Sequence, residues 1–331
     1  MPDFLRRIWD PARYQGRAVA RRYYEGWYFK QADAQRRRVL AVIPGVSFSE
    51  DGASSHAFIQ VVTNVGKPHY FSYPLESFTV DPTKPFNVTI GENSFSQEGM
   101  VLRLRKGNTE IKGEIGFGPW TPWPVRVLSP GVMGWYRFVP RMETYHGVLS
   151  LDHEVEGAVM LDGETVCLDG GRGYSEKDWG HSFPRSWIWA QSNHFERPGV
   201  SLSLSVAKIP WMTGAFVGNI AGLMIDGTLY RFTTYTGARL ASLAVGTNEA
   251  HLILRDRHAE LEVGIHGGMP VALKSPLLGV MDGHDAESLD GTVDVAMRTL
   301  KGGRPTLLFQ GTGMLAGVEV MDKHDELGSI A

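Results

Sequence analysis

Apolar and polar residues alternate with a period of two along much of this chain, and Asp-Gly pairs separate many of the alternating runs. Alternation of this kind places the apolar side chains on one face of a strand. Asp-Gly readily adopts the positive φ angles of tight hairpin turns. The pairs begin at residues 51, 162, 169, 226, 282 and 290. The pattern therefore predicts an all-β, antiparallel fold with strands at 101–105, 109–117, 201–207, 259–267 and 293–300.

Helical periodicity is scarce. The candidates are a short N-terminal piece near 3–9 and the segment 131–142, which Pro140 limits. Residues 209–225 are uncharged and nearly long enough to span a membrane, but proline and several glycines interrupt them. We therefore expect a hairpin buried in the protein there and no integral membrane span.

The length of 331 residues predicts two domains, because single cores usually stop growing at about 250–300 residues. A glycine and tryptophan open a strand-rich stretch twice, in "EGWYFK" (25–30) and "GHSFPRSWIWAQ" (180–191). We place the boundary near 165–175, giving β domains at 1–170 and 171–331. Two barrels or sandwiches satisfy these observations, and one continuous large sandwich is the alternative.

Charge and cysteine content restrict the partners and the compartment. A net charge of −3 gives no overall attraction to nucleic acid or to an anionic membrane surface. Cys167 is the only cysteine, which excludes an intrachain disulfide and favours a reduced, cytoplasmic setting. The first 27 residues lack the apolar segment of an export signal.

Common cofactor and hydrolase motifs are absent from the sequence. The glycines at 170, 171 and 173 have the wrong spacing for a dinucleotide fingerprint, and there is no GxxxxGK[ST], HExxH or GxSxG. His181 and His194 lack a third ligand at a usual metal spacing. We therefore expect neither cofactor nor metal.

Residues 173–195, "GYSEKDWGHSFPRSWIWAQSNHF", combine aromatic and charged side chains at unusual density. If its second half is a strand, alternation puts Trp187, Trp189, Gln191, Asn193 and Phe195 on one face. These residues suit a pocket with aromatic walls and amides that hold a polar head group; the alternative is a barrel core. The other face, with Ser186, Ile188, Ala190, Ser192 and His194, is expected to pack within the protein.

The first half of this segment, "EKDWG", is expected to form a loop, for which three interpretations stay open. In one, Glu176 or Asp178 is a proton donor whose pKa is set by Lys177 or a nearby arginine. In the second, Lys177 or Arg185 pairs with an acid in a structural plug that Trp179 closes. In the third, the charges are simply exposed.

Three further features belong with this segment. Glu25 and Lys30 lie on either side of Trp27 in the sequence, and this group likewise has a functional and a structural interpretation. His181 is a candidate acid or base, or a histidine bonded to the loop backbone. Tyr174 is a candidate donor to a substrate oxygen.

These motifs resemble a known family. "YYEGWYFK" (23–30) and "GRGYSEKDWGHSFPRSWIWAQSNHF" (171–195) are similar to paired signatures of the tocopherol cyclase-like proteins, and "GWYRFVPRMETYHG" (134–147) and "YRFTTYTGA" (230–238) extend the likeness. The resemblance implies two lipocalin-like β domains, related to those of carotenoid hydratase-type proteins, that bind an apolar ligand. It also implies closure of a chromanol ring on a prenylated hydroquinone, without redox change and without a metal.

Such a reaction needs an acid that protonates an alkene, a wall that tolerates a cation, and a base or simply solvent to take the phenolic proton; tryptophan faces attract cations. A non-catalytic carrier of a hydrophobic small molecule and a scaffold protein are the alternative functions. The site prediction has three parts: the catalytic residues Glu176, Asp178 and His181; the substrate-binding residues Trp27, Tyr174, Trp179, Trp187, Trp189, Gln191 and Asn193; and a structural lock of Glu25, Lys30, Lys177 and Arg185.

Overall fold

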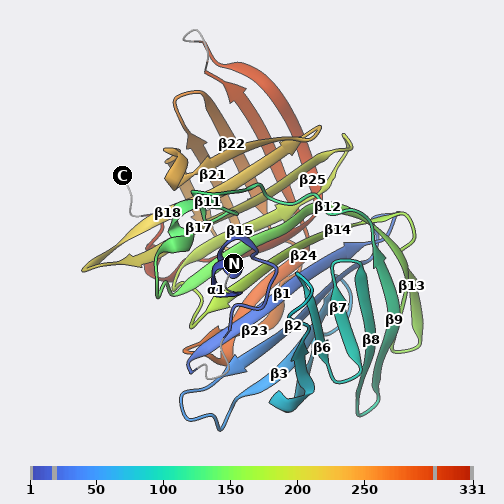
Figure 1. Cartoon of the computed structure of the whole chain (residues 1–331). Helices are drawn as coiled ribbons and strands as arrows, with labels where there is room; N and C mark the ends of the chain where they lie inside the picture. Colours follow the sequence, from blue (N-terminus) through green and yellow to red (C-terminus); the bar gives the residue numbers. More distant parts are fainter. Residues whose placement is uncertain (1–2, 17–20, 301–303, 329–331) are drawn as a thin grey trace. The chain divides into compact units, whose positions relative to one another are not determined.

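The computed structural model describes residues 3–16, 21–300 and 304–328, and antiparallel strands dominate this part of the chain (Figure 1). The described chain divides into two units. The first comprises 1–183 together with 273–284, and the second comprises 184–272 together with 285–331. The all-β, antiparallel prediction is confirmed.

The first unit contains, among its described residues, a 12-stranded sheet in the order β4-β3-β2-β1-β14-β12-β9-β8-β7-β6-β5, with β13 beside β12. Its apolar core takes residues from strands along nearly the whole sheet, from Phe71 on β4 to Val88 on β6, so the sheet curves around one core. The strands are β1 (Tyr23–Ala32), β2 (Val39–Phe48), β3 (His56–Thr63), β4 (His69–Tyr73), β5 (Phe78–Val80), β6 (Asn87–Ile90), β7 (Asn93–Ser96), β8 (Gly99–Lys106), β9 (Thr109–Phe117), β12 (Thr144–Leu161), β13 (Glu164–Cys167) and β14 (Gly171–Gly180).

Short elements complete this unit. Helix α1 (Asp3–Trp9) confirms the predicted N-terminal helix. The segment 131–142 contains only a 3₁₀ turn, η2 (Gly134–Phe138), because the chain becomes extended at Val139, the residue before Pro140, whose ring disfavours a helical predecessor. A small hairpin, β10 (Val125–Arg126) and β11 (Ser129–Pro130), precedes η2, and η1 (Leu75–Ser77) precedes β5.

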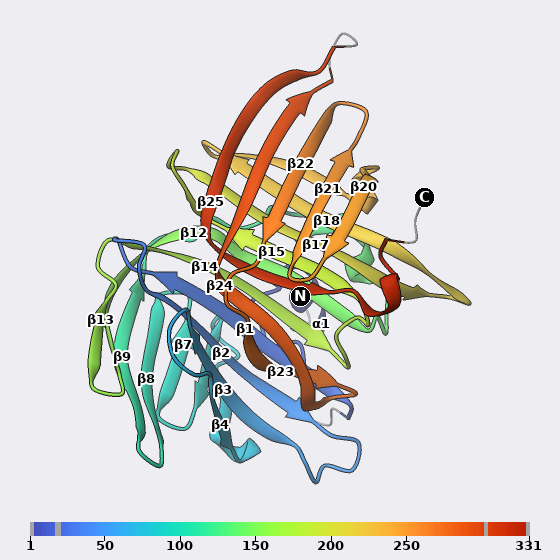
Figure 2. The same ribbon diagram turned by 180° about the vertical axis from the view of Figure 1, so that it is seen from behind.

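An 11-stranded sheet, most of which belongs to the second unit, has within the described residues the order β19-β18-β17-β15-β25-β24-β22-β21-β20, with β16 beside β25 and β23 beside β24 (Figure 2). Most of β23 and the first residues of β24 lie in 273–284, which belong to the first unit. The core of the second unit again draws on strands from both ends of the sheet. The elements are β15 (Trp187–Ser192), β16 (His194–Phe195), β17 (Val200–Trp211), β18 (Gly214–Ile225), β19 (Thr228–Thr233), η3 (Thr234–Thr236), β20 (Arg239–Gly246), β21 (Glu249–Arg255), β22 (Ala259–His266), β23 (Val271–Leu277), β24 (Val280–Thr299), β25 (Thr306–Met321) and η5 (Lys323–Asp325).

The boundary between the units differs from the predicted one near 165–175. The chain leaves the first unit after Phe183, because β14 pairs with β1 on one side and with β12 on the other. Residues 273–284 then return to the first unit. There the Gln60 side chain exchanges hydrogen bonds with the backbone of Lys274, and Ser47 donates to the carbonyl of Gly279.

The five predicted strands all coincide with observed strands, and two of them, 259–267 and 293–300, extend one residue past the observed end. Asp162-Gly163 and Asp226-Gly227 turn with positive φ at both residues, as two-residue hairpins require. The pairs at 282 and 290 instead lie inside β24, and the register between β24 and β25 shifts around Gly291. Asp-Gly permits a tight turn but does not impose one.

The apolar segment 209–225 forms the β17–β18 hairpin, as predicted, although its tip at Met212 is exposed rather than buried. In the described part of the chain, no helix is long and apolar enough to cross a bilayer. Cys167 ends β13, where its thiol is exposed.

Candidate acid–base site

The crowded segment around Glu176 is strand β14 rather than the expected loop. Both edges of β14 are hydrogen-bonded, so its backbone is fully used by neighbouring strands. Alternation separates its side chains into two sets. Tyr174, Glu176 and Asp178 lie on one face of the sheet, and Lys177 and Trp179 lie on the other.

Glu176 and Asp178 meet a histidine from β12. His146 is the register partner of Asp178. The His146 Nδ1 atom lies 2.9 Å from Asp178 Oδ1, and its Nε2 atom lies 3.7 Å from Glu176 Oε2. The Tyr174 hydroxyl donates to Glu176 Oε2 over 2.5 Å. These four residues, the β14 acid–base cluster, form a continuous polar chain.

Charge on the cluster is shared between one imidazole and two carboxylates. Burial alone lowers the pKa of His146, but the negative charges of Asp178 and Glu176 outweigh burial and raise this pKa from 6.5 to about 9. His146 is therefore protonated at neutral pH. Tyr174 and Glu176 are buried, whereas the side chains of His146 and Asp178 are 12% and 23% exposed.

The donor set of this cluster also suits a divalent metal. One ligand atom from each of His146, Glu176 and Asp178 lies within 4.8 Å of the others. An imidazole with two carboxylates is a combination that zinc and other transition metals accept. The expectation of a metal-free protein therefore stays a prediction that metal analysis must test.

The opposite face of β14 holds a buried ion pair. Lys177 Nζ lies 2.5 Å from Glu25 Oε1, and both side chains are fully buried. The Glu25 carboxylate also accepts hydrogen bonds from the backbone N–H groups of Gln15 and Gly16 and from the Tyr23 hydroxyl. A buried charge pair is stable only when its remaining lone pairs and protons are satisfied in this way.

Aromatic rings enclose the Lys177 ammonium. It lies 4.6 Å from the Trp27 ring centre and 5.0 Å from that of Trp179, within the range of cation–π attraction. Burial lowers the pKa of Lys177 from 10.5 to about 8 despite the Glu25 charge. The set Glu25, Lys177, Trp27 and Trp179, which we call the lysine lock, has the contacts expected of the structural plug.

Trp27 and Trp179 were predicted to bind substrate, and the structure places them in the lysine lock instead. Their indoles lie on the side of the sheet opposite to Glu176, and Trp27 donates its Nε1–H to the carbonyl of Ala12. Two residues assigned to the lock lie elsewhere. Lys30 occupies the other face of β1, in register with Tyr174, and Arg185 lies in the second unit, 3.7 Å from Glu326.

The remaining predicted binding residues belong to the second unit. Trp187 and Trp189 lie on β15, where Trp187 donates to Glu319 over 2.7 Å. Gln191 and Asn193 contact each other at 3.4 Å. Phe195 was expected on their face, but the strand breaks at Asn193 and Phe195 packs in the core with Ile188 and Ala190. The packing predicted for Ile188 and Ala190 is confirmed.

His181 follows the last residue of β14. Its backbone N–H donates to the Glu143 carbonyl, but its buried Nδ1 has no hydrogen-bond partner in the described structure. Burial, reinforced by Arg22, lowers the pKa of His181. The expected side-chain bond to the loop backbone is not observed, and no described contact joins His181 to Glu176 or Asp178.

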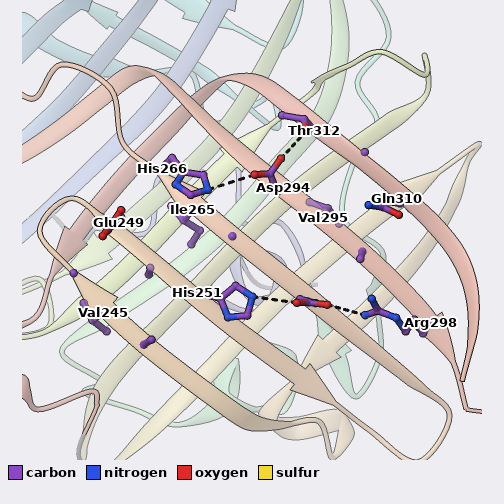
Figure 3. A pocket seen from close by; sticks show the side chains of 17 residues that line it. Val245, Glu249, His251, Ile265, His266, Asp294, Val295, Arg298, Gln310 and Thr312 are labelled. Atoms are coloured by element: carbon purple, nitrogen blue, oxygen red, sulfur yellow. Dashed lines mark hydrogen bonds and ion pairs between the residues drawn. The ribbon is translucent and has the colours of Figure 1, made fainter.

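A second polar region lies in the second unit, in a groove of about 730 Å³ over β20, β21, β22, β24 and β25 (Figure 3). His266 lies 3.3 Å from Asp294, and His251 lies 3.1 Å from Glu262, which also pairs with Arg298. Both histidines are half exposed, so water screens these pairs. The groove offers paired surface charges, whereas the β14 acid–base cluster is more enclosed, with His146 only 12% exposed.

Sequence reasoning missed His146, although "ETYHG" lies within one of the resemblance segments. The available signal was the alternation of Thr144, His146 and Val148 toward one face. Nothing local reveals that His146 lies opposite Asp178, because that register joins residues 32 positions apart.

Comparisons with known proteins agree with the fold. The pattern described as Tocopherol cyclase-like matches residues 92–321, more than half of the chain. The match includes β12 and β14 but not "YYEGWYFK" at 23–30. A probable chloroplastic tocopherol cyclase of Oryza sativa subsp. japonica is 23% identical, covering 71% of this chain and 62% of that protein. The chain thus spans less than two thirds of the length of the curated relatives it matches.

Two solved structures share the fold at low sequence identity. The crystal structure of CghA with Sch210972 superposes with a TM-score of 0.56 at 12% identity, covering 91% of this chain and 89% of that one. Kievitone hydratase from Nectria haematococca superposes with a TM-score of 0.50 at 11% identity, covering 90% and 88%. The extended match to the family pattern shows that the chain belongs to the tocopherol cyclase-like family.

Proposed function

We propose that this protein is a cofactor-independent cyclase that adds a phenolic hydroxyl to an alkene within one hydrophobic, prenylated substrate. The observation that carries the proposal is the β14 acid–base cluster, in which the buried Tyr174 and Glu176 meet the half-buried His146 and Asp178. Membership of the tocopherol cyclase-like family supports this class of reaction. The curated relatives are named as tocopherol cyclases, and a prenylated hydroquinone is the first substrate to test.

The reaction is an isomerisation, so the proton that the enzyme donates to the substrate must be balanced by a proton that the substrate gives back. An acid protonates the less substituted alkene carbon, and the resulting tertiary cation is captured by the phenolic oxygen. A C–O bond forms, the alkene π bond is lost, and the phenolic proton leaves to a base. No oxidant or reductant is needed.

The cluster supplies both proton transfers in this proposal. Its extra proton rests on His146 between two carboxylates, and coupled groups of this kind share a proton as a unit. A carboxylic acid is a stronger acid than an imidazolium with a pKa of about 9. Transfer from His146 Nε2 to Glu176, 3.7 Å away, therefore creates the competent donor. The phenolic proton then refills the cluster.

Other predicted residues keep supporting parts. Tyr174 orients the Glu176 carboxyl through its 2.5 Å hydrogen bond. Asp178 holds His146 in its protonated form. Trp187, Trp189, Gln191 and Asn193 remain proposed ligand contacts of the second unit, and His181 remains a proposed auxiliary acid or base.

The test is turnover of prenylated hydroquinones by the full chain, followed by chromatography of the chromanol product. We expect product from the wild type and a loss of about 10²–10⁴-fold in the Glu176→Gln variant, the usual contribution of one general acid. Glu262→Gln is the matched control, because Glu262 also contacts a histidine but on the exposed groove. That control keeps the wild-type rate.

A ligand that binds tightly and returns unchanged in every assay would identify a carrier and overturn the proposal. Turnover that disappears with a chelator and returns with a divalent metal would replace acid catalysis by metal-assisted chemistry at the same three side chains. Metal analysis of the purified chain separates these outcomes.

A further inference from the structure

The first unit carries an exposed apolar surface at the β10–β11 hairpin and η2. At the tip of the β10–β11 hairpin, Val127 and Leu128 are 75% and 79% exposed. On η2, Trp135 and Phe138 are 45% and 42% exposed. We call these four residues, together with Trp9 of α1, the hairpin patch.

Direct contacts join the three segments of the hairpin patch. Trp9 donates its Nε1–H to the Val127 carbonyl over 3.0 Å, and its ring packs edge-on against Phe138 at 6.0 Å. Arg137 donates to the carbonyl of Arg7, which ties η2 to α1. Single exposed apolar residues are ordinary, but a joined group on a surface marks an interaction site.

Positive charge surrounds this apolar surface. Residues 6–16 and 120–143 contain six arginines, no lysine and two acids, a net of +4, whereas the whole chain carries −3. Arg6, Arg126 and Arg141 are exposed, on α1, on the hairpin and directly after η2. One of the two acids, Asp10, is already paired with Arg13. The net charge of the chain therefore conceals a local basic surface.

We propose that the hairpin patch docks the protein on the surface of an anionic lipid membrane. Val127 and Leu128 enter the boundary between headgroups and acyl chains, the indoles of Trp9 and Trp135 lie at the headgroup level, and the arginines bind lipid phosphates. Apolar tips, interfacial tryptophan and flanking arginine are the features by which proteins bind to one leaflet without crossing it. This inference stands independently of the proposed cyclase activity.

The charge distribution favours a membrane over a second copy of this chain. A two-fold interface brings the same surface of both subunits together. Here it would place the net charge of +4 of these segments against the same charge on the second copy, which opposes association. An anionic bilayer supplies both the apolar layer and the opposite charge.

Vesicle flotation of the full chain tests the docking. We expect the wild type to float with phosphatidylcholine vesicles that contain phosphatidylglycerol, and to float weakly with phosphatidylcholine alone. Binding weakens as salt rises, because electrostatic attraction to the surface is screened. The Val127→Asp/Leu128→Asp variant loses at least about tenfold in vesicle affinity, since two apolar side chains are replaced by like-charged groups that the leaflet repels.

Matched controls separate docking from general surface changes. The double variant Met212→Asp/Met269→Asp introduces the same two charges at residues 94% and 71% exposed in the second unit. This control is expected to float like the wild type. Brominated lipids report insertion directly through quenching of tryptophan fluorescence, and this quenching falls in a Trp9→Phe/Trp135→Phe variant.

Three results would overturn the proposal. One is failure of the wild type to float with either vesicle. Another is equal flotation of the wild type and the Val127→Asp/Leu128→Asp variant. The third is a dimer in sedimentation analysis that becomes a monomer in this variant without any vesicle binding, which would assign the surface to a second copy.

Discussion

The two faces of β14 bury charge in opposite ways. On the core face of the first unit, Lys177 is held by Glu25 and two indoles, and burial lowers its pKa to about 8. On the other face, His146 lies between two carboxylates, which raise its pKa to about 9. The lysine lock has one acid for one base, whereas the acid–base cluster has two acids for one base. The one-to-one pair of the lysine lock has a structural role. In the acid–base cluster, the second carboxylate gives the proton on His146 another site to which it can move.

The largest expected effect is a loss of activity, and it concerns only the face of β14 that carries the acid–base cluster. His146→Asn removes the proton store of the cluster, and we expect turnover to fall by about 10²–10⁴-fold with little change in substrate affinity. His251→Asn, in the exposed groove, is the control and keeps full turnover. Initial rates over a range of substrate concentrations give kcat and KM separately. A His146→Asn variant with normal kcat would remove the histidine from the mechanism.

The second effect concerns stability on the lock face. Lys177→Met leaves the Glu25 carboxylate buried without its counter-ion, which costs about 3–5 kcal/mol in the free energy of unfolding. Adding Glu25→Gln to the same chain removes the uncompensated charge and recovers part of this loss. Urea unfolding of both variants measures the difference. Equal stability of the single and double variants would show that the pair is not coupled.

A third prediction uses pH. The folded-state pKa of His146 is about 9 and its ordinary value is 6.5, so its stabilisation is complete below pH 6.5 and is lost as pH rises toward 9. The full shift corresponds to about 3 kcal/mol. The contribution of Lys177 to stability has the opposite sign, because its folded-state pKa of about 8 lies below its ordinary value of 10.5. This contribution therefore becomes more favourable as pH rises from 8 to 10.5.

Chemical unfolding at several pH values measures these slopes. We expect stability to fall from pH 6.5 to 8 in the wild type but not in His146→Asn. A wild type whose stability is flat across this range would contradict the charge assigned to His146.

The smallest expected effect concerns Tyr174. Replacement by Phe removes the hydroxyl that donates to Glu176, at a cost of about 1–2 kcal/mol in transition-state stabilisation, or roughly tenfold in kcat. The lysine lock, on the opposite face, keeps its stability. Activity assays and urea unfolding of the same variant check both statements. An unchanged kcat would show that Glu176 needs no orienting donor.

Local pattern was sufficient to predict the strands but not their partners. Alternation in 109–117 and 259–267 reports one buried face, and both segments are strands. The "EKDWG" stretch was expected to be a loop, but it lies in strand β14. Charged side chains of this strand have partners that lie far away in the sequence, Glu25 for Lys177 and His146 for Asp178.

Alternation predicts the wrong face for a side chain when the strand is interrupted. Trp187 and Phe195 have the same parity, yet the break at Asn193 returns Phe195 to the core. The 165–175 boundary fails for a different reason. A domain ends where contacts cease, and β14 makes contacts with β1 and β12 up to Gly180. Neither a strand break nor a long-range register leaves a mark in local composition.

The first unit is discontinuous in sequence, and this fixes the order in which a newly made chain can complete it. Residues 273–284 supply bonds to Ser47, Gln60 and Ser182. All of residues 184–272 are synthesised before that segment emerges from the ribosome, although domains generally fold in order from the N-terminus. A fragment that stops at Phe183 lacks residues 273–284, so expression of that fragment would yield an incomplete first unit.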